Sequence, residues 1–515
     1  MTKILYLSVK ESVPPTGYWD HEFIKDIFAD IPKTDRQVVV IPGAYQWDVI
    51  DKINVELNKF KKILVIITSD EEGKFDTRKL KHDDMIIYSQ YGNGGHMFPL
   101  GYSPRTRETL REFGLVPKTL DWFFAGQITH PRREMCAQQL RNLSKGTLVE
   151  TDGFAKGMNK KEYLYNMSIA KTAPCPPGAV SVESFRLYEA LEAGACPIAD
   201  DMGALKSYRE KYWQQLFGDV NFPTFVDYKD LPMLIEKSVE YPNMNNQVMA
   251  WWINKKHQFK ERLKRQLGVP KDEVMVVVPV SPIPSHPDTA MIEETIASIR
   301  VHMPDAPIII TLDGVRPEQE DRRADYEEFQ KRLLWKINFE HKNILPVIFP
   351  HHMHQSGMMK VVLKQTDIPM ILYVEHDTPL TPDRPIDWDK CKDYIRSGKS
   401  NVIRFHFEAH IPEEHKYLMF GEPEDGFQKT AQWSQRPHLA STEMYKIIME
   451  LFSDESNCFI EDYAYGKFET LCREQGLRGW EKWRVHIYHP DGDIKRSHNL
   501  DGRKDDYKFV DEQVW

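Results

Sequence analysis

No stretch of this chain approaches the ~20 consecutive apolar residues that a membrane-spanning helix needs. The first residues, MTKILYLSVKESVPP, contain an apolar run too short for a signal peptide and no small-residue cleavage site. We therefore expect neither a membrane anchor nor a secretory leader. A cytoplasmic protein is the expectation, in the host cytoplasm if a phage encodes it.

The chain also lacks cysteine patterns and an excess of positive charge. Its six cysteines are scattered without the paired spacing of a disulfide framework or a zinc site. A net charge of −9 at pH 7 argues against a generally basic surface of the kind that binds nucleic-acid phosphates. Internal repeats that link the two halves and low-complexity tracts are absent, so we expect two unlike parts joined together and not a duplication.

What the sequence does contain is two series of alternating strands and helices. A length of 515 residues suffices for two or three domains. The first series predicts two Rossmann-like halves, at about residues 1–115 and 116–250, that meet at a ligand cleft. A helix rich in lysine and arginine is expected to link the domains over residues 251–271. A fresh series then predicts a second α/β domain over residues 272–515.

The most informative segment is SVESFRLYEALEAGACPIADD, residues 181–201. Its helical spacing predicts a packed face made of Leu187, Ala190, Leu191 and Gly194. Arg186 and Glu189 then project away from that face. The helix follows the turn-forming CPPGAVS, so its first amides are free to bind a diphosphate, and Glu189 can accept hydrogen bonds from ribose hydroxyls.

The string SFRLYEALEAGACPI resembles the exostosin family of glycosyltransferases, and WFFAGQITHPRR upstream fits a second element of that family. The resemblance implies that the first domain has the GT-B fold, with both elements in its second half. It also implies donor-binding roles for residues of both elements: Gly126, Arg132, Arg133, Ser184, Arg186 and Glu189.

The second domain resembles a GT-A glycosyltransferase domain. One strand ends in Asp313, as in a nucleotide-binding half, and the strand MILYV ends in Glu375, His376 and Asp377. Oxygen ligands suit Mn²⁺ or Mg²⁺. Glu375 and Asp377 are expected to hold the metal as a variant of the family's DxD motif, and the resemblance adds His489 from a late strand.

Two further motifs occur in the order that a GT-A domain requires. The segment QWSQRPHLAS offers an aromatic ring and hydrogen-bonding groups for an acceptor sugar: Trp433, Gln435, Arg436 and His438. The alternative is a buried tryptophan in a loop. FIEDYAYGKF resembles the motif that supplies the catalytic base, so Glu461 or Asp462 is expected to deprotonate the acceptor hydroxyl.

Two basic clusters are expected to be peripheral. His351, His352 and His354 follow a strand without ligands at defined spacing, so a solvent-facing loop is favoured over a metal site. The linker helix carries six cationic residues: Lys255, Lys256, Lys260, Arg262, Lys264 and Arg265. It is interpreted mainly as a solvated connector, with contact to an anionic acceptor as the alternative.

Together these motifs predict a tandem glycosyltransferase, bifunctional if both sites are active. It would transfer sugars from a nucleotide sugar, a UDP-sugar in the first instance, to a hydroxyl of a glycan or polysaccharide. Exostosins are membrane-anchored and have consecutive aspartates where this chain has EHD, so their substrates do not transfer. The alternatives are a phage enzyme that glycosylates hydroxymethylated DNA bases and an inactive sugar-nucleotide-binding or lectin-like scaffold.

Overall fold

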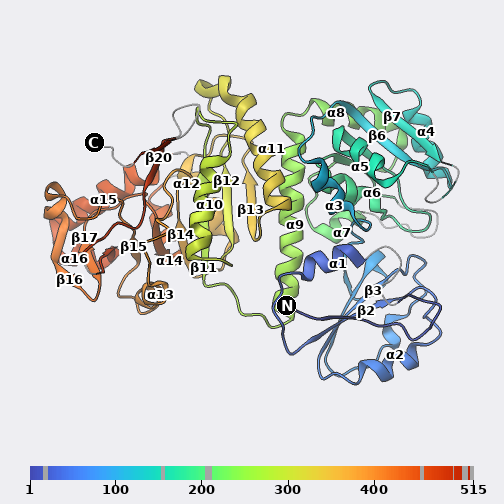
Figure 1. Ribbon diagram of the computed structural model, residues 1–515, viewed down its shortest axis with the longest axis horizontal. Coiled ribbons are helices and arrows are strands. Elements are labelled where there is room, and N and C mark those ends of the chain that lie inside the picture. Colours follow the sequence, from blue (N-terminus) through green and yellow to red (C-terminus); the bar gives the residue numbers. More distant parts are fainter. Residues whose placement is uncertain are drawn as a thin grey trace. The chain divides into compact units, whose positions relative to one another are not determined.

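The computed structural model divides the chain into two compact units, residues 1–270 and 271–515 (Figure 1). Both units combine helices with sheets, and the expected α/β class is confirmed. Within the described residues, none of the helices has the length and apolar character needed to cross a membrane. The described residues are 1–14, 21–151, 153, 157–202, 211–452, 458–490, 492–501 and 508–510.

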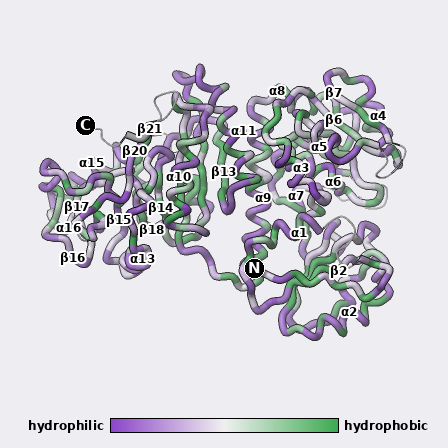
Figure 2. The backbone as a smooth tube through the Cα atoms, in the orientation of Figure 1, coloured by the Kyte–Doolittle hydropathy of each residue, from purple (hydrophilic) through white to green (hydrophobic). Residues whose placement is uncertain are grey.

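The first unit begins with a parallel sheet whose strands neighbour one another in sequence order. They are β1 (Ile4–Tyr6), β2 (Gln37–Pro42), β3 (Ile63–Thr68), β4 (Met85–Ser89) and β5 (His96–Met97). The apolar run of β2 stands out in Figure 2. Its alternate residues pack on opposite faces, Val38 and Val40 with α1 (His21–Phe28), and Val39 and Ile41 with α2 (Ile50–Leu57). Strand order never reverses, so this sheet lacks the switch point at which α/β sheets bind ligands.

A second parallel sheet of the first unit does contain a switch point. Its order is β7-β6-β8-β9-β10, so the strands that follow β6 in sequence lie on both sides of it. The crevice of such a sheet opens at the carboxyl ends of β6 and β8. The strands are β6 (Leu120–Gln127), β7 (Gly146–Thr151), β8 (Ala170–Cys175), β9 (Cys196–Asp200) and β10 (Thr224–Phe225). Its helices are α3 (Thr106–Phe113), α4 (Pro131–Leu140), α5 (Lys160–Ile169), α6 (Phe185–Glu192), α7 (Tyr212–Phe217) and α8 (Leu231–Glu240).

Helix α9 (Met244–Gln266) packs against both halves of the first unit (Figure 1). Trp252 and Phe259 lie in one hydrophobic cluster with residues of both sheets. Gln266 accepts a hydrogen bond from the Tyr88 hydroxyl at 2.5 Å. The segment expected to be a connector is therefore part of the first unit's core.

The basic residues of α9 do not form a free cationic surface. Lys255 is buried and donates to the carbonyl of Phe217 at 2.9 Å. Lys260 pairs with Asp30 at 2.9 Å, and Lys264 with Glu261 at 2.7 Å. Of the six cations expected on a solvated helix, Arg262 and Arg265 are the ones that are exposed.

A buried carboxylate fixes α9 to the rest of the unit. Glu192 on α6 pairs with Arg107 of α3 at 2.7 Å and with Lys256 of α9 at 2.5 Å, and it accepts a hydrogen bond from the Trp252 indole at 2.7 Å. Burial alone would raise the pKa of the Glu192 carboxyl, but Lys256 and Arg107 outweigh it and lower that pKa to about 2. Three helices thus meet at one charged group.

The second unit is built on a nine-stranded mixed sheet of order β13-β12-β11-β14-β18-β15-β19-β17-β16. Strands β11 to β14 are parallel, and the order reverses between β11 and β14. The strands are β11 (Val274–Val280), β12 (Ile308–Leu312), β13 (Ile344–Ile348), β14 (Met370–Tyr373), β15 (Val402–Arg404), β16 (Met419–Glu424), β17 (Phe427–Thr430), β18 (His438–Ser441) and β19 (Val485–Tyr488). Near the C-terminus, β20 (Asn499–Asp501) pairs with β21 (Lys508–Val510).

Helices cover this sheet and connect its strands. One hydrophobic cluster joins β11 and β14 to α12, α14, α15 and α16. Thr295 of α10 donates to the carbonyl of His376 at 2.8 Å, which ties α10 to the segment after β14. The helices are α10 (Ala290–His302), α11 (Arg323–Phe339), α12 (His354–Gln365), α13 (Trp388–Arg396), α14 (Thr442–Glu450), α15 (Ile460–Gln475) and α16 (Leu477–Trp483).

The Glu192 cluster predicts a large effect on stability. Glu192→Gln would remove the buried carboxylate that pairs with both Arg107 and Lys256, and breaking such a buried ion pair costs about 3–5 kcal/mol in comparable sites. The free energy of unfolding, taken from the first unit's transition in urea, measures this loss. The exposed Glu236 on α8 provides the control, and Glu236→Gln should change stability by less than about 0.5 kcal/mol.

The same carboxylate predicts a pH dependence. Because its folded-state pKa is depressed, its stabilising contribution is complete above pH ~4.5 and is lost as pH falls toward 2. The stability difference between wild type and Glu192→Gln should therefore shrink over that interval. A difference that stays constant from pH 5 to pH 3 would contradict the ion-pair assignment.

Candidate functional site

Acidic side chains gather at the carboxyl edge of the second unit's sheet, beside its switch point. Glu375 and Asp377 lie two and four residues after the end of β14. Glu375 accepts a hydrogen bond from the Gln355 amide of α12 at 2.6 Å. Burial, followed by the charges of Asp377 and Glu461, raises the pKa of Glu375 to about 8. Residues far apart in sequence therefore form one crowded carboxylate cluster.

Arg436 is the cation that faces this cluster. Its charge opposes the rise in the pKa of Glu375. Its guanidinium lies 3.9 Å from the ring centre of Phe407 and donates to the side chain of Asn499. The amide of Leu500 donates to the carbonyl of Asp377 at 2.8 Å. The C-terminal segment thus brings Asn499 to the site, which sequence spacing did not indicate.

The two carboxylates expected to supply the base have different surroundings. Both lie in the first turn of α15. Glu461 accepts a hydrogen bond from the backbone amide of Gln435 at 2.9 Å and contributes to the cluster. Asp462 is exposed, and no hydrogen bond or ion pair holds its carboxylate within the described part of the chain. Asp462 has room for an acceptor, whereas Glu461 is held in place.

Two of the four residues expected to bind an acceptor are buried in the core, and the other two interact with the carboxylate cluster. Trp433 is 1% exposed and packs edge-on against Trp483, so the alternative of a buried tryptophan is correct. His438 is fully buried, bonded to the Tyr445 hydroxyl at 2.5 Å, and burial lowers its pKa to about 4. Of these four residues, Arg436 and the backbone of Gln435 interact with the carboxylate cluster.

His489 lies away from the other two expected metal ligands. It follows β19, and β18 and β15 separate β19 from β14 in the sheet. At the usual strand spacing this is roughly 14 Å, whereas ligands of one hard cation lie ~2–2.6 Å from it. No group of three His, Cys, Asp or Glu residues in the described ranges is arranged to hold a metal ion. Strand pairing thus places the end of β19, which His489 follows, three strands away from the end of β14.

Asp313 organises the histidine loop at the neighbouring strand end. Its carboxylate accepts hydrogen bonds from the backbone amides of Met353 at 2.6 Å and His354 at 3.1 Å, and it pairs with His352 at 2.8 Å. Burial, with Arg316 and His352, lowers the pKa of His354 to about 4. The loop is therefore anchored to the sheet edge, contrary to the expected solvent-facing loop.

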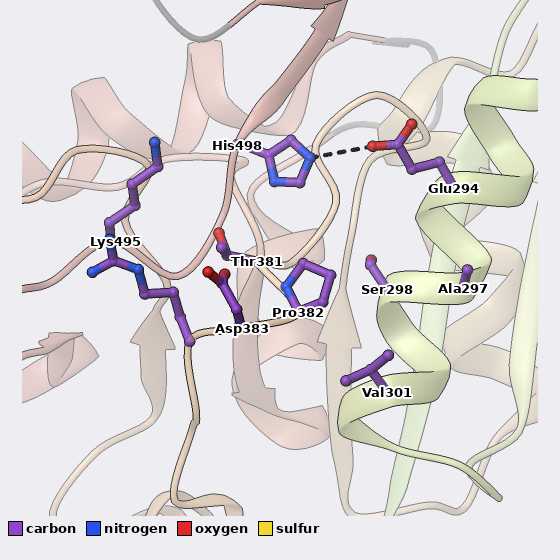
Figure 3. Close-up of a pocket in the computed structure, with 10 residues that line it drawn as sticks. Glu294, Ala297, Ser298, Val301, Thr381, Pro382, Asp383, Lys495 and His498 are labelled. Carbon is purple, nitrogen blue, oxygen red and sulfur yellow. Dashed lines mark hydrogen bonds and ion pairs between the residues drawn. The ribbon is translucent and has the colours of Figure 1, made fainter.

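A pocket of about 510 Å³ lies against α10 (Figure 3). One wall is a single face of α10, and the other is the loop after β14 together with the C-terminal segment. His498, next to Asn499, pairs with Glu294 across its upper end at 3.5 Å. The volume is within the range of small-ligand sites. Seven of the ten lining residues are polar or charged: Glu294, Ser298, Thr381, Asp383, Arg384, Lys495 and His498.

In the first unit, two guanidinium groups lie at the crevice between β6 and β8. Arg133 donates to the carbonyls of Gln127 at 3.2 Å and Pro177 at 3.1 Å, which bridges the two strand ends. Arg186 donates to the carbonyl of Ala125 at 2.7 Å. A side chain at Gly126 would place Cβ 2.4 Å from the Arg186 guanidinium, so that guanidinium would have to shift. The expected Gly126, Arg133 and Arg186 are brought together.

Arg132 has different partners from those of Arg133 and Arg186. It pairs with the buried Asp200 at the end of β9 at 2.6 Å and donates to the carbonyl of Val226 at 3.0 Å. Tyr228 donates to the same carboxylate at 2.7 Å. Arg132 therefore already has a structural countercharge.

Helix α6 is buried on all sides, and this corrects the orientation expected for Glu189. Glu189 is 6% exposed, pairs with Lys160 at 3.7 Å and accepts a hydrogen bond from Ser103. Its replacement by alanine would leave Lys160 without this partner, so a loss of stability is expected. Ser184 is the N-cap residue of α6, and its side chain makes no capping hydrogen bond.

No protein-family model and no curated protein matches the chain. Among solved structures it is similar to residues 1–349 of TarS from S. aureus, at 13% identity over 44% of this chain and 60% of that chain, with a TM-score of 0.29. The same fragment in complex with UDP-GlcNAc matches at 14% identity over 44% and 58% of the two chains, with a TM-score of 0.28. A UDP-glucose pyrophosphorylase complexed with UDP-glucose matches at 9% identity over 44% and 93%, also at 0.28. The match spans less than two thirds of the TarS fragment, and similarity at this level assigns neither a family nor an activity.

The raised pKa of Glu375 predicts how stability depends on pH. The folded state binds an extra proton between pH ~4.5 and 8, so the stability that this group contributes is lost as pH rises through that interval. In EDTA, the melting temperature of wild type relative to Glu375→Gln should fall from pH 5 to pH 8. The control is Glu422→Gln, at an exposed position of β16, whose melting temperature should change with pH in the same way as that of wild type. The same pH dependence for Glu375→Gln and wild type would contradict the prediction.

Proposed function

We propose that this chain is a nucleotide-sugar-dependent glycosyltransferase that transfers a sugar to an acceptor hydroxyl. The observation that carries the proposal is the convergence of Glu375, Asp377 and Glu461 with Arg436 at the switch point of the mixed sheet. Ligands of open α/β sheets bind at such points. The exostosin resemblance rests on short motifs, so this finer family assignment is part of the proposal.

The carboxylate cluster fits a divalent cation. Burial and the charges of Asp377 and Glu461 raise the pKa of Glu375 to about 8. A bound cation would relieve the repulsion between these carboxylates. We propose Glu375 and Asp377 as ligands of Mn²⁺ or Mg²⁺, without His489. When bound, the ion would neutralise charge on the leaving diphosphate. Arg436 would orient the same diphosphate through charge-assisted hydrogen bonds.

Asp462 is proposed as the general base, with Glu461 as the residue that fixes the α15 terminus. A base must reach the acceptor hydroxyl within hydrogen-bond distance, and Asp462 is the exposed member of the pair. Because Trp433 and His438 are buried, we assign no acceptor contact to them. The pocket beside α10 does not include Asp462 in its lining, so we propose that it holds a part of the acceptor away from the reacting hydroxyl. Its mixture of charged groups and hydroxyls suits a hydrophilic acceptor.

In the first unit, we propose a second nucleotide-sugar site at the crevice between β6 and β8. The amides at the start of α6 and the guanidinium groups of Arg133 and Arg186 supply donors for a diphosphate. A UDP-sugar is the proposed donor for both sites. The two units together would make the chain bifunctional.

A glycan is favoured over DNA as the acceptor. The DNA alternative depended on the basic helix, but Lys255, Lys256, Lys260 and Lys264 are paired within the first unit. A net charge of −9 adds to this argument. The inactive scaffold remains the alternative of another class, and measurable transfer or donor hydrolysis excludes it.

Asp377 should be essential for metal-dependent turnover. Asp377→Asn removes one charged ligand, so we expect UDP-sugar turnover to fall by about a hundredfold or more and the response to Mn²⁺ to disappear. Release of UDP is measured with and without EDTA. Asp425 pairs with Lys390 in an exposed turn and has a positive φ of 53° that asparagine tolerates, so Asp425→Asn is the matched control. Full wild-type activity in EDTA would refute the metal assignment.

Substitutions of Asp462 and Glu461 should have different effects on the kinetic constants. Asp462→Asn removes the base and should lower kcat by about 10²–10⁴-fold with little change in the KM for the donor. Glu461→Gln should alter both constants, because it perturbs the carboxylate cluster and the Gln435 contact. Steady-state kinetics with varied UDP-sugar distinguish these outcomes, and a pure KM effect of Asp462→Asn would count against it as the base.

A further inference from the structure

A carboxylate from the first half of the first unit reaches the crevice of the second half. Glu71 follows β3, and its Oε1 accepts hydrogen bonds from three groups of the loop before α6. These are the amides of Val180 at 3.3 Å and Ser181 at 3.4 Å, and the Ser181 hydroxyl at 3.3 Å. The same loop leads into the helix whose first amides are proposed to bind a diphosphate.

The turn that carries Glu71 is held by its own hydrogen bonds. The Asp70 carboxylate accepts from the amides of Lys74 at 3.0 Å and Phe75 at 3.2 Å, and Asn93 donates to the Asp70 carbonyl at 2.5 Å. Ser69 adopts a positive φ of 52°, a conformation that non-glycine residues seldom take. Glu71 is therefore placed by a constrained turn, which distinguishes it from a freely rotating surface side chain.

The groups around Glu71 have the character of an anion site. At Gly178, a Cβ would lie 2.8 Å from the Glu71 carboxylate, so glycine permits this approach. Burial and the charge of Arg186 lower the pKa of Arg133 to about 10, and Glu71 acts in the opposite direction. Arg186 is 8% exposed, and its Nε has no hydrogen-bond partner among the described residues. Two guanidiniums are thus crowded together, and Glu71 is a carboxylate that acts on one of them, Arg133.

We propose that Glu71 occupies the anion site of the first unit in place of a diphosphate, so that ligand binding and the Glu71 contact exclude each other. The amides of Val180 and Ser181 cannot serve two anions at once, and a diphosphate beside Glu71 would be repelled. This inference rests on the proposed donor site of the first unit. It adds that Glu71 sets the affinity of that site.

The contact is suited to displacement. Its hydrogen bonds of 3.3–3.4 Å exceed the ~2.7–2.9 Å of strong charge-assisted bonds. Other contacts keep the loop in place when Glu71 leaves, because Glu183 accepts hydrogen bonds from the Leu100 amide at 2.9 Å and the Tyr212 hydroxyl at 2.5 Å. A diphosphate can therefore replace Glu71 without separating the two halves.

Hydrogen exchange in the full-length chain tests this competition at the site itself. In EDTA, inorganic pyrophosphate and UDP are titrated while exchange is followed in peptides that cover residues 176–184. Glu71→Gln should speed exchange of these amides in the ligand-free protein. It should also lower the half-saturating ligand concentration about tenfold, as expected if Glu71 fills the site about nine-tenths of the time.

Glu72→Gln is the matched control, because it removes the same charge from the same turn and Glu72 pairs with Lys74 instead. Its half-saturating concentration should stay within twofold of wild type. Glu71→Asp withdraws the carboxylate by one methylene and should also lower the half-saturating ligand concentration. This variant replaces Glu71→Gln in the test if Glu71→Gln does not fold.

The outcomes separate the two proposals. Binding to folded Glu71→Gln that is equal to or weaker than binding to Glu72→Gln overturns the competition while leaving the donor site intact. Absence of ligand protection in every variant overturns the anion site, and with it the proposed function of the first unit.

Discussion

The first unit depends on one buried charge. Glu192 lies on α6 between Arg107 of α3 and Lys256 of α9, and removing this carboxylate would break two ion pairs in a low-dielectric interior. Because α6 is also the helix at the crevice, the position of the crevice amides depends on the same cluster. Arg107 reaches Asp26 of α1 as well, at 3.3 Å, which extends the constraint to the first sheet. The ion cluster therefore fixes the halves that form the site.

The two units offer opposite electrostatic surroundings at equivalent places. In the first unit, the carboxyl ends of β6 and β8 carry Arg133 and Arg186, which suit an anion directly. In the second unit, the end of β14 carries Glu375 and Asp377, which suit an anion only through a cation. The proposed donor diphosphate can be stabilised in either way. One fold-level position thus supports two kinds of chemistry.

Much of the architecture could be predicted from local sequence. The apolar runs of β2, β3, β11 and β14 marked the strands, and their alternation with helices indicated parallel sheets, because such strands must be covered on both faces. The EHD motif at the end of β14 marked the edge at which the carboxylates meet. Gly126, Arg133 and Arg186 were also found from sequence, and the structure brings them together.

Strand order and burial depended on tertiary structure. Trp433 and His438 had the composition of a sugar site, yet packing against Trp483 and Tyr445 placed them in the core. The sequence determined the α/β class, the strand ends and the acidic motif, since these follow from hydrophobic periodicity and local spacing. Long-range packing alone decided which strands neighbour one another and which cations of α9 are neutralised. It also decided that Asn499 rather than His489 reaches the acidic cluster. These contacts join residues that no local pattern relates.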